Sequence, residues 1–280
     1  MEQDRARTIR DRMRQDWAGR SRYYAANAAE KNRGYAKTLV ALVNPAPGER
    51  VLDVATGPGV VALEAAHAVG PTGQVAATDL VPEWEAVIAE ACAREHLTAV
   101  EFQTMGAEAL TFPDGIFDVA FCQFGLMFLP DPVQALREMH RVLRDGGRLG
   151  VAVWSTPDKV GHFLVLRTAL KYGPRVPPAE RMPSPLDLGE PGLIERHVAS
   201  AGFRQIEVTY ETREMIVTDP EAEWRKHRDE PSGMAAKVIA ALAADERERL
   251  HDEVIEALNH YRQEGMVRLP SEAIIVTARR

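Results

Sequence analysis

The stretch VLDVATGPG at residues 51–59 decides the fold and leads directly into an alanine-rich segment at 60–69. Its first five residues form a short apolar run with β-branched valines, as a buried strand does. Two glycines follow, and they allow backbone to approach a ligand where a side chain would collide. The helical pattern that begins after Gly59 stops at Gly70. The sequence therefore predicts a strand at 51–55, a glycine-rich turn and a helix at 60–69.

The same alternation of apolar runs and helical patterns continues along the chain. Further strands are predicted at 74–78, 99–104, 117–124, 148–154, 203–217 and 273–278, and further helices at 82–96, 131–143, 162–171, 193–201 and 235–264. Short strands that alternate with helices indicate a parallel, doubly wound sheet. We therefore expect an α/β fold with a mostly parallel, seven-stranded, Rossmann-like sheet whose last strand is antiparallel, together with added helical lid segments.

The chain has 280 residues, enough for one large domain with a sizeable core. We expect an N-terminal helical lid at residues 1–44 and a Rossmann-like domain at 45–280. Helical insertions into that domain are expected near 155–192 and 218–265. A monomer and a homodimer are both compatible with the sequence.

Charge and composition argue against several classes of protein. The 34 Lys and Arg residues and the 41 Asp and Glu residues give a net charge of −7, which argues against a nucleic-acid partner. Residues 1–37 carry ten basic and five acidic residues, so this segment is +5 and the remainder is −12. The sequence has no apolar run of about 18 residues, so no membrane span is expected. The arginine-rich N-terminus also lacks the apolar block of a secretory signal, and we expect a cytoplasmic protein.

The cysteines and histidines do not indicate a metal site. Cys92 and Cys122, the two cysteines, lie far apart in apolar runs, so they provide neither a disulfide framework nor a zinc site. The eight histidines show no ligand-like spacing with carboxylates on one face. No metal cofactor is therefore expected.

The glycine-rich turn allows two interpretations. Residues 57–62 match the dinucleotide-binding pattern G-x-G-x-x-G/A, and Asp79 follows Gly57 by 22 residues, near the spacing of a ribose-binding carboxylate. This pattern would fit a nicotinamide-dependent oxidoreductase. Asp53, however, would repel a pyrophosphate bound at the helix N-terminus, whereas it would attract a ligand that carries an ammonium group.

Four blocks of sequence follow one another in order and together span roughly residues 48–154. They are VLDVATGPG at 51–59, VAATDL at 75–80, and two longer blocks at 106–131 and 135–154. As a set they resemble the class I S-adenosylmethionine-dependent methyltransferases. The resemblance is greatest to the group that contains the ubiquinone/menaquinone C-methyltransferases and many natural-product enzymes.

This resemblance implies S-adenosylmethionine as the cofactor and S-adenosylhomocysteine as its product. Asp53 would bind the methionine ammonium, directly or through water, and Asp79 would accept hydrogen bonds from both ribose hydroxyls. The other cofactor residues that the family implies are Ala55, Thr56, Gly57 and Gly59 under the methionine and ribose, Leu80 and Ala107 at the adenine, and Gln123 near the methionine end.

One position departs from the family pattern. The family commonly has an aspartate immediately before the position of Ala107, where it bonds the exocyclic amine of adenine, but this chain has Gly106. Adenine recognition in this chain therefore rests either on backbone groups or on Glu108.

The acceptor half of the reaction is only weakly encoded. Methyl transfer from a sulfonium is an in-line displacement, and a general base is needed only when the nucleophile arrives protonated. We expect a small-molecule acceptor of anionic or aromatic character, with a carbon, oxygen or nitrogen nucleophile. The candidate bases are His162, which is preferred, Tyr23 and Tyr24, and the candidate pocket residues are Phe124, Met127, Phe128, Trp154 and Trp224.

Three functions stay open on the sequence alone. The first is a small-molecule methyltransferase, and the second is a nicotinamide-dependent oxidoreductase. The third is a protein that binds S-adenosylmethionine without catalysis. Binding of S-adenosylhomocysteine separates the first from the second, and turnover separates the first from the third.

Overall fold

The computed structural model describes residues 2–27, 29–173, 182–230 and 233–280. Its strands are β1 (Arg50–Val54), β2 (Gln74–Asp79), β3 (Val100–Thr104), β4 (Phe117–Gln123), β5 (Leu143–Trp154), β6 (Arg204–Val217), β7 (Arg262–Gln263) and β8 (Met266–Arg279). They form one sheet in the order β3-β2-β1-β4-β5-β8-β6, and the short β7 pairs with β8 outside this path. The predicted α/β class, with a mostly parallel sheet and antiparallel last strands, is confirmed.

The helices of the described chain alternate with the strands through its first half. They are α1 (Glu2–Asn27), α2 (Ala29–Val43), α3 (Val60–Val69), α4 (Trp84–Glu95), α5 (Pro132–Val142), α6 (Leu164–Tyr172), α7 (Leu193–Ser200), α8 (Pro220–Asp229), α9 (Met234–Ala241) and α10 (Ala244–His260). Short 3₁₀ helices lie at η1 (Leu126–Phe128), η2 (Pro157–Lys159) and η3 (Gly161–Phe163). Each described helix is too short or too polar to cross a membrane.

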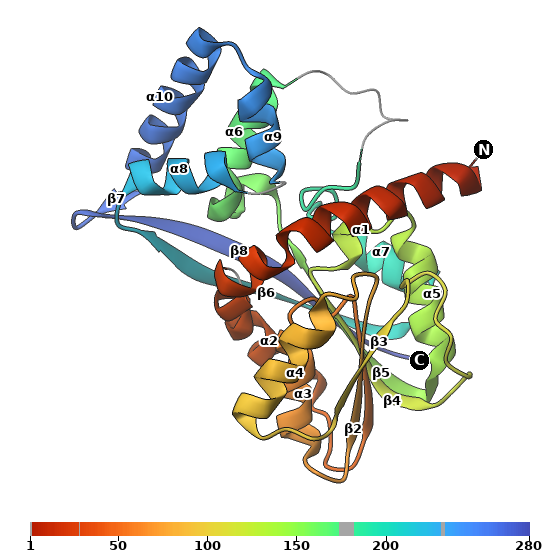
Figure 1. Cartoon of the computed structure of the whole chain (residues 1–280). Coiled ribbons are helices and arrows are strands. Elements are labelled where there is room, and N and C mark those ends of the chain that lie inside the picture. Colours follow the sequence, from red (N-terminus) through yellow and green to blue (C-terminus); the bar gives the residue numbers. More distant parts are fainter. Residues whose placement is uncertain (1, 28, 174–181, 231–232) are drawn as a thin grey trace. The chain divides into compact units, whose positions relative to one another are not determined.

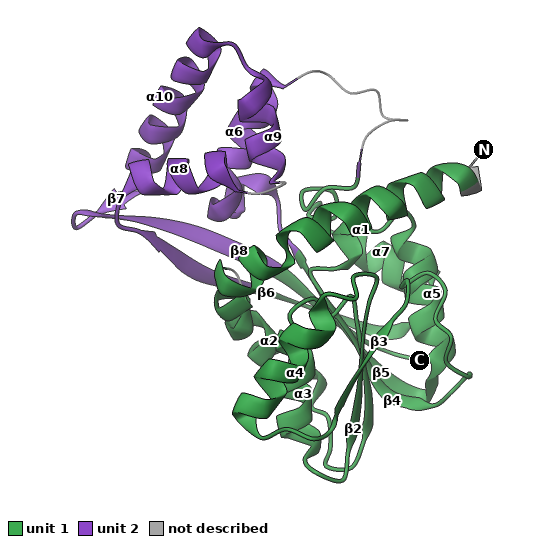
Figure 2. Cartoon of the chain, viewed as in Figure 1, with its two compact units in different colours: residues 1–153, 183–210, 274–280 green, residues 154–182, 211–273 purple. Residues whose placement is uncertain are grey.

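The chain divides into two compact units (Figure 2). Unit 1 consists of residues 1–153, 183–210 and 274–280, and unit 2 consists of residues 154–182 and 211–273. In unit 1, helices α2, α3 and α4 cover one face of the sheet, and α5 and α7 cover the other (Figure 1). In unit 2, α6 packs against α9 and α10, and α8 packs against the same two helices. The expected division into a lid at 1–44 and a domain at 45–280 stays a prediction.

The parallel register of the central strands positions the site. Asp53 of β1 lies opposite Ala77 of β2 on one side and Phe121 of β4 on the other. Asp79, which ends β2, lies opposite Thr104, which ends β3. The carboxyl ends of β1 to β4 therefore meet along one edge of the sheet, where ligands bind in open α/β sheets.

Several predicted boundaries were wrong. The helix predicted at 131–143 ends at Val142, because Leu143 is already extended and pairs with Phe117 of β4. Gly146 and Gly147, which would be expected to stop a helix, lie inside β5. The single helix predicted at 235–264 is divided into α9 and α10, with α8 before them, and the last strand begins at Met266 instead of Ala273. Residues 174–181 of the insertion expected near 155–192 lie outside the described residues.

Candidate functional site

Asp53 ties the end of β1 to the turn that follows it. The residue is only 1% exposed, and its Oδ2 accepts hydrogen bonds from the Thr56 hydroxyl at 2.5 Å and from the Ala62 N–H at 3.0 Å. The Ala62 N–H belongs to the first turn of α3, whose N–H groups have no partner within the helix. Burial away from water raises the pKa of Asp53 to about 7. Asp53 therefore fixes the turn through its hydrogen bonds to Thr56 and Ala62. Its predicted contact with the methionine ammonium stays a prediction.

Asp79 lies beside the same turn at the end of β2. Its Oδ2 accepts a hydrogen bond from the Gly57 N–H at 2.9 Å, and its Oδ1 accepts one from the Val81 N–H at 3.0 Å. Burial raises its pKa to about 6, against the opposing effect of these backbone hydrogen bonds. Asp79 and the following Leu80 both keep part of their surface exposed. The structure thus joins the predicted ribose-binding acid to the predicted glycine-rich turn.

The two glycines of the turn are needed for different reasons. Both have positive φ, 52° at Gly57 and 82° at Gly59, which disfavours any side chain. A Cβ at Gly59 would lie 2.9 Å from Ile88 Cγ1, so α4 packs closely on the turn there. A Cβ at Gly57 would meet no described atom within 4 Å. The backbone of Gly57 therefore borders open space beside Asp79, whereas Gly59 is fixed by packing between helices.

Two other residues at neighbouring strand ends hold a left-handed backbone conformation. Ala55, directly after β1, has φ 53°, and Phe124, directly after β4, has φ 56°. Non-glycine residues seldom adopt such values, and this kind of strain concentrates at functional sites. A Cβ at Gly125 would lie 2.5 Å from the Ala55 Cβ, so the two turns pack directly on each other.

The loop between β3 and β4 carries the predicted adenine-binding residues, Gly106, Ala107 and Glu108. Its start is fixed by the Met105 N–H, which donates a hydrogen bond to the Asp79 carbonyl at 2.9 Å. Ala107 is buried, with 7% of its surface exposed. The loop thus starts at a backbone hydrogen bond to Asp79, the predicted ribose-binding residue.

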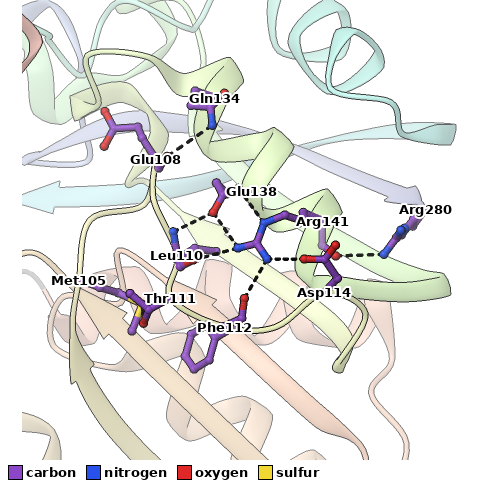
Figure 3. Close-up of polar contacts among 10 residues, drawn as sticks. All are labelled: Met105, Glu108, Leu110, Thr111, Phe112, Asp114, Gln134, Glu138, Arg141 and Arg280. Atoms are coloured by element: carbon purple, nitrogen blue, oxygen red, sulfur yellow. Dashed lines mark hydrogen bonds and ion pairs between the residues drawn. The ribbon is translucent and has the colours of Figure 1, made fainter. Parts of the chain in front are cut away.

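Arg141 of α5 fastens the far side of this loop (Figure 3). It donates hydrogen bonds to the carbonyls of Leu110 and Phe112 at 2.9 and 2.8 Å, and it pairs with the carboxylates of Glu138 and Asp114. The hydrogen bonds that Arg141 donates to Glu138 and Asp114 raise its pKa further above the usual arginine value. Sequence reasoning missed this anchor, because an arginine on a polar helix face looks like ordinary solvated surface.

Arg10 of α1 reaches the same loop. Its Nε lies 3.7 Å from Glu108 Oε2, an ion pair beyond hydrogen-bond distance. The Glu108 side chain is 8% exposed, and its carboxylate points away from the Arg141 cluster (Figure 3). A Cβ at Gly106 would lie 4.0 Å from both Arg10 Nε and Glu108 Oε2. Gly106, Glu108 and Arg10 therefore come together just past the end of β3.

Aromatic side chains gather where α1 crosses the ends of β2 and β4. Trp17 of α1 packs edge-to-face on Tyr24 at 5.2 Å and on Phe128 at 5.3 Å, and Tyr24 packs on Trp84 of α4 at 6.3 Å. Sequence reasoning named Tyr24 and Phe128 and missed Trp17 and Trp84. Trp17 and Tyr24 lie on the same helix, but their contacts with Phe128 and Trp84 join distant parts of the chain, which no local pattern predicts.

The polar neighbours of this aromatic group include another predicted residue. Gln123, at the end of β4, donates from Nε2 to the Asn32 carbonyl at 3.3 Å, and the Asn32 amide donates to the Tyr24 hydroxyl at 2.7 Å. Tyr23 is partly exposed, and its carbonyl accepts a hydrogen bond from Asn27. Among the predicted pocket residues, Phe124 packs on Tyr35, and Met127 is buried in the core.

The remaining candidate residues belong to unit 2. Trp154 and His162 pack edge-to-face at 4.4 Å, and His162 also contacts Phe163 at 4.2 Å. The His162 Nδ1 lies 3.1 Å from the Ser271 hydroxyl of β8. Trp224 of α8 is 4% exposed and packs on His251 at 5.5 Å. The roles predicted for His162, Trp154 and Trp224 stay predictions.

The described residues contain no cluster of three or more His, Cys, Asp or Glu side chains that would hold a metal ion. The charged groups at the strand ends are instead two buried or half-buried aspartates with raised pKa values and one Arg10–Glu108 pair. Such a set suits an organic ligand with an ammonium group, hydroxyls and a polar ring.

Comparison with known families gives a match for the part of the chain that carries this site. Residues 52–151 match a family model described as a methyltransferase domain. An uncharacterized protein of Mycobacterium tuberculosis is 39% identical over 153 residues, which are 55% of this chain and 54% of that protein. The ubiquinone/menaquinone biosynthesis C-methyltransferase of Geobacter sp. is 35% identical over 130 residues, 44% of this chain and 55% of the relative. The chain thus spans about half the length of these curated relatives.

Similarity to two other proteins extends over more of the chain. The nocamycin O-methyltransferase of Saccharothrix syringae is 28% identical over 209 residues, covering 71% of this chain and 75% of that enzyme. The crystal structure of the YcgJ protein of Bacillus subtilis superimposes with a TM-score of 0.59 at 19% identity, covering 88% of this chain and 98% of that one. At this identity the structural likeness shows the fold alone.

Proposed function

We infer the function from the family: the chain carries a domain of the class I S-adenosylmethionine-dependent methyltransferases. From this premise we propose that it transfers the methyl group of S-adenosylmethionine to a small-molecule acceptor and releases S-adenosylhomocysteine. One observation carries the proposal: the hydrogen bond between the Gly57 N–H and Asp79, beside open space at the meeting point of β1 and β2. A carboxylate and accessible backbone lie together there, which supports the ribose site that the resemblance to the family implies.

The polar groups around this point fit each part of the cofactor. Asp79 keeps partial exposure, so its two oxygens can exchange their backbone partners for ribose hydroxyls or share them. Asp53 lies below the turn with a raised pKa, and a nearby ammonium would favour its ionised form. The Gln123 Oε1 is buried and has no hydrogen-bond partner within the described part of the chain, which suits a donor on the methionine end.

The bound cofactor supplies a methyl group on a sulfonium, and the chain's own residues align and desolvate the acceptor. We assign the aromatic group of Trp17, Tyr24, Trp84 and Phe128 to the acceptor side, since it contains two of the residues predicted there. Flat, apolar side chains of this kind favour an aromatic or otherwise planar acceptor. The proposal includes natural-product acceptors, because the Saccharothrix relative is a nocamycin O-methyltransferase.

His162 is proposed as the general base when the acceptor atom arrives protonated. Its Nδ1 is within hydrogen-bond distance of the Ser271 hydroxyl, a contact that fixes the orientation of the ring. With Nδ1 donating to Ser271, Nε2 would be the nitrogen that takes the acceptor proton. Carbon, oxygen and nitrogen nucleophiles differ in their need for this base, so its mutation also reports on the acceptor atom.

The location and the metal requirement complete the proposal. Both cysteines, Cys92 and Cys122, are buried free thiols, which fits a reducing compartment such as the cytoplasm. We propose that the reaction proceeds without a metal ion, because the charge of the sulfonium already activates the methyl group. Addition of a chelator should leave turnover unchanged.

The first experiment is isothermal titration of the protein with S-adenosylhomocysteine and, separately, with NADH. We expect saturable binding of S-adenosylhomocysteine with a micromolar dissociation constant and none of NADH. A panel of phenols, quinols and carboxylic acids is then incubated with S-adenosylmethionine, and release of S-adenosylhomocysteine is measured. Binding of NADH alone would favour the oxidoreductase, and cofactor binding without turnover on any acceptor would favour a non-catalytic binding protein.

A further inference from the structure

The ion pair between α1 and the loop that joins β3 to β4 has an unusual hydrogen-bonding state. This loop carries the predicted adenine-binding residues. Arg10 Nε and Glu108 Oε1 are both buried, and neither has a hydrogen-bond partner among the described residues. They belong to the same pair, in which Arg10 Nε is 3.7 Å from the other carboxylate oxygen, Oε2. Buried polar atoms of native proteins almost always have a partner. One donor and one acceptor thus lie side by side with their bonding capacity unused.

The glycine at position 106 provides the space for this pair. A Cβ built there would lie 4.0 Å from Arg10 Cδ, Arg10 Nε and Glu108 Oε2. Cβ alone would be in ordinary contact, but a longer side chain continuing from it would meet the pair. The acid that the family commonly carries at this position would therefore compete with Glu108 for the same arginine. The departure at Gly106 and the presence of Arg10 and Glu108 are two parts of one arrangement.

The spare donor and the spare acceptor match one edge of adenine. Its Watson–Crick edge presents an acceptor, N1, beside a donor, the exocyclic amine, and proteins read unpaired bases on this edge. We propose that Glu108 Oε1 accepts from the adenine amine and that Arg10 Nε donates to N1, so that α1 completes the adenine site. The inference rests on the proposed function, and it adds a specificity-determining residue that lies outside the matched domain at 52–151.

The charges of the pair support this division of labour. The attraction of the Arg10 guanidinium for Oε2 turns the carboxylate so that Oε1 is the oxygen left for a ligand. The Glu108 side chain is 8% exposed, so its hydrogen bonds form away from water and count strongly toward specificity. A ring with the opposite pattern, such as hypoxanthine with a protonated N1 and a carbonyl at C6, would leave both buried groups unpaired.

The test compares S-adenosylhomocysteine with S-inosylhomocysteine by isothermal titration of the full chain. For the wild type we expect the adenine compound to bind at least about 100-fold more tightly, because a site built for one hydrogen-bond pattern rejects the reverse. Arg10→Ala should weaken S-adenosylhomocysteine binding about tenfold. Glu108→Gln should reduce the preference between the two compounds, since the glutamine amide can turn and donate to the hypoxanthine carbonyl.

Arg12→Ala is the matched control, because Arg12 lies on the same helix and is exposed. It should bind both compounds as the wild type does. Equal affinity of the wild type for the two compounds would overturn the inference without any variant, as would unchanged preference in both Arg10→Ala and Glu108→Gln. If the wild type fails to bind S-adenosylhomocysteine at all, the proposed function fails with it. Normal binding without base preference overturns the role of Arg10 and Glu108 alone.

Discussion

The candidate residues of unit 1 and unit 2 are held together in different ways. In unit 1, Asp53 bonds to Ala62 nine residues on, and Asp79 bonds to Gly57 across 22 residues. In unit 2, the contact of His162 with Ser271 joins residues 109 positions apart. The turn that holds Asp53 and Asp79 is therefore built from one strand-turn-helix unit and the next strand, whereas the position of His162 depends on a contact between distant segments.

Because of this difference, mutations in the two units should affect different measured properties. Local hydrogen bonds fix the turn after β1, and changes there should act on cofactor binding first. The candidates of unit 2 lie outside the matched domain at 52–151, and changes there should act on turnover and leave cofactor binding intact. The experiments below test that separation.

The largest effect is expected from Asp79→Asn in unit 1. The amide keeps the size of the carboxylate but can accept from only one of its two ends, so the bonds to the Gly57 and Val81 N–H groups and to ribose cannot all be made. S-adenosylhomocysteine should bind about 100-fold more weakly by isothermal titration. Asp145→Asn, at a fully exposed position of the same unit, should bind normally. Near-normal affinity of Asp79→Asn would remove Asp79 from the cofactor site.

The next effect concerns unit 2, where we expect a change in turnover and not in cofactor binding. His162→Gln retains a group that can hydrogen-bond to Ser271 but cannot take up a proton, so kcat should fall at least about tenfold. The dissociation constant for S-adenosylhomocysteine should stay within about twofold of the wild type. The control is His260→Gln on α10, an exposed histidine in the same unit.

Two results would contradict the separate roles that we expect for the two units. Loss of cofactor affinity in His162→Gln would show that unit 2 contributes to the cofactor site. Unchanged kcat with intact folding would instead remove His162 from the mechanism. A carbon or amine nucleophile that needs no base would then be favoured for the acceptor.

The same distinction explains what could be predicted from the sequence. The strands and the turn at 51–59 follow from local patterns, so the fold class could be predicted, whereas the hydrogen bond between Asp79 and the glycine-rich turn was found only in the structure. Strand β8 was found only in its apolar core, because the polar half from Met266 shows no strand signal and is fixed by pairing. Arg10 and Arg141 were missed for a related reason. An arginine on a helix looks solvated until the loop that it holds is known.

The pH dependence of stability tests the role of Asp53 in the turn after β1. Burial raises the pKa of Asp53 to about 7 in the folded chain, above its value of 3.8 in water. The folded state therefore binds the proton more tightly than the unfolded state, so stability falls as pH rises from about 4 to 7 and the cost is complete above 7. Asp53→Asn keeps an acceptor for Thr56 and Ala62 without the charge, and its stability should fall less over this range.

Urea unfolding at pH 5 and pH 8 measures this difference. The wild type should lose about 2 kcal/mol more than Asp53→Asn between the two values. Some pH dependence should remain in the variant, because the pKa of Asp79 is also raised, to about 6. Asp145→Asn should follow the wild type. Identical slopes for the wild type and Asp53→Asn would mean that the pKa of Asp53 is the same in the folded and the unfolded chain, so that burial does not raise it.

The smallest effect is expected from a long-range contact in unit 1 that contributes to stability and not to cofactor binding. Arg33 of α2 grips Glu95 of α4 with two hydrogen bonds, at 2.9 and 2.8 Å, across 62 residues. These bonds, with one from His67, lower the pKa of Glu95 to about 2. The stabilisation is therefore present above the unfolded pKa, near 4.5, and is lost as pH falls through about 2.

Glu95→Gln should lower the free energy of unfolding by about 1 kcal/mol at pH 7, since the pair is only partly shielded from water. The difference from the wild type should shrink as pH approaches 2. Glu90→Gln is the matched control, because Glu90 is exposed on the same helix. Cofactor affinity should be unchanged in both variants. If Glu95→Gln also weakens S-adenosylhomocysteine binding, then α2 and α4 transmit strain to the turn through Ile88, which packs on Gly59, and the cofactor site depends on more than its local hydrogen bonds.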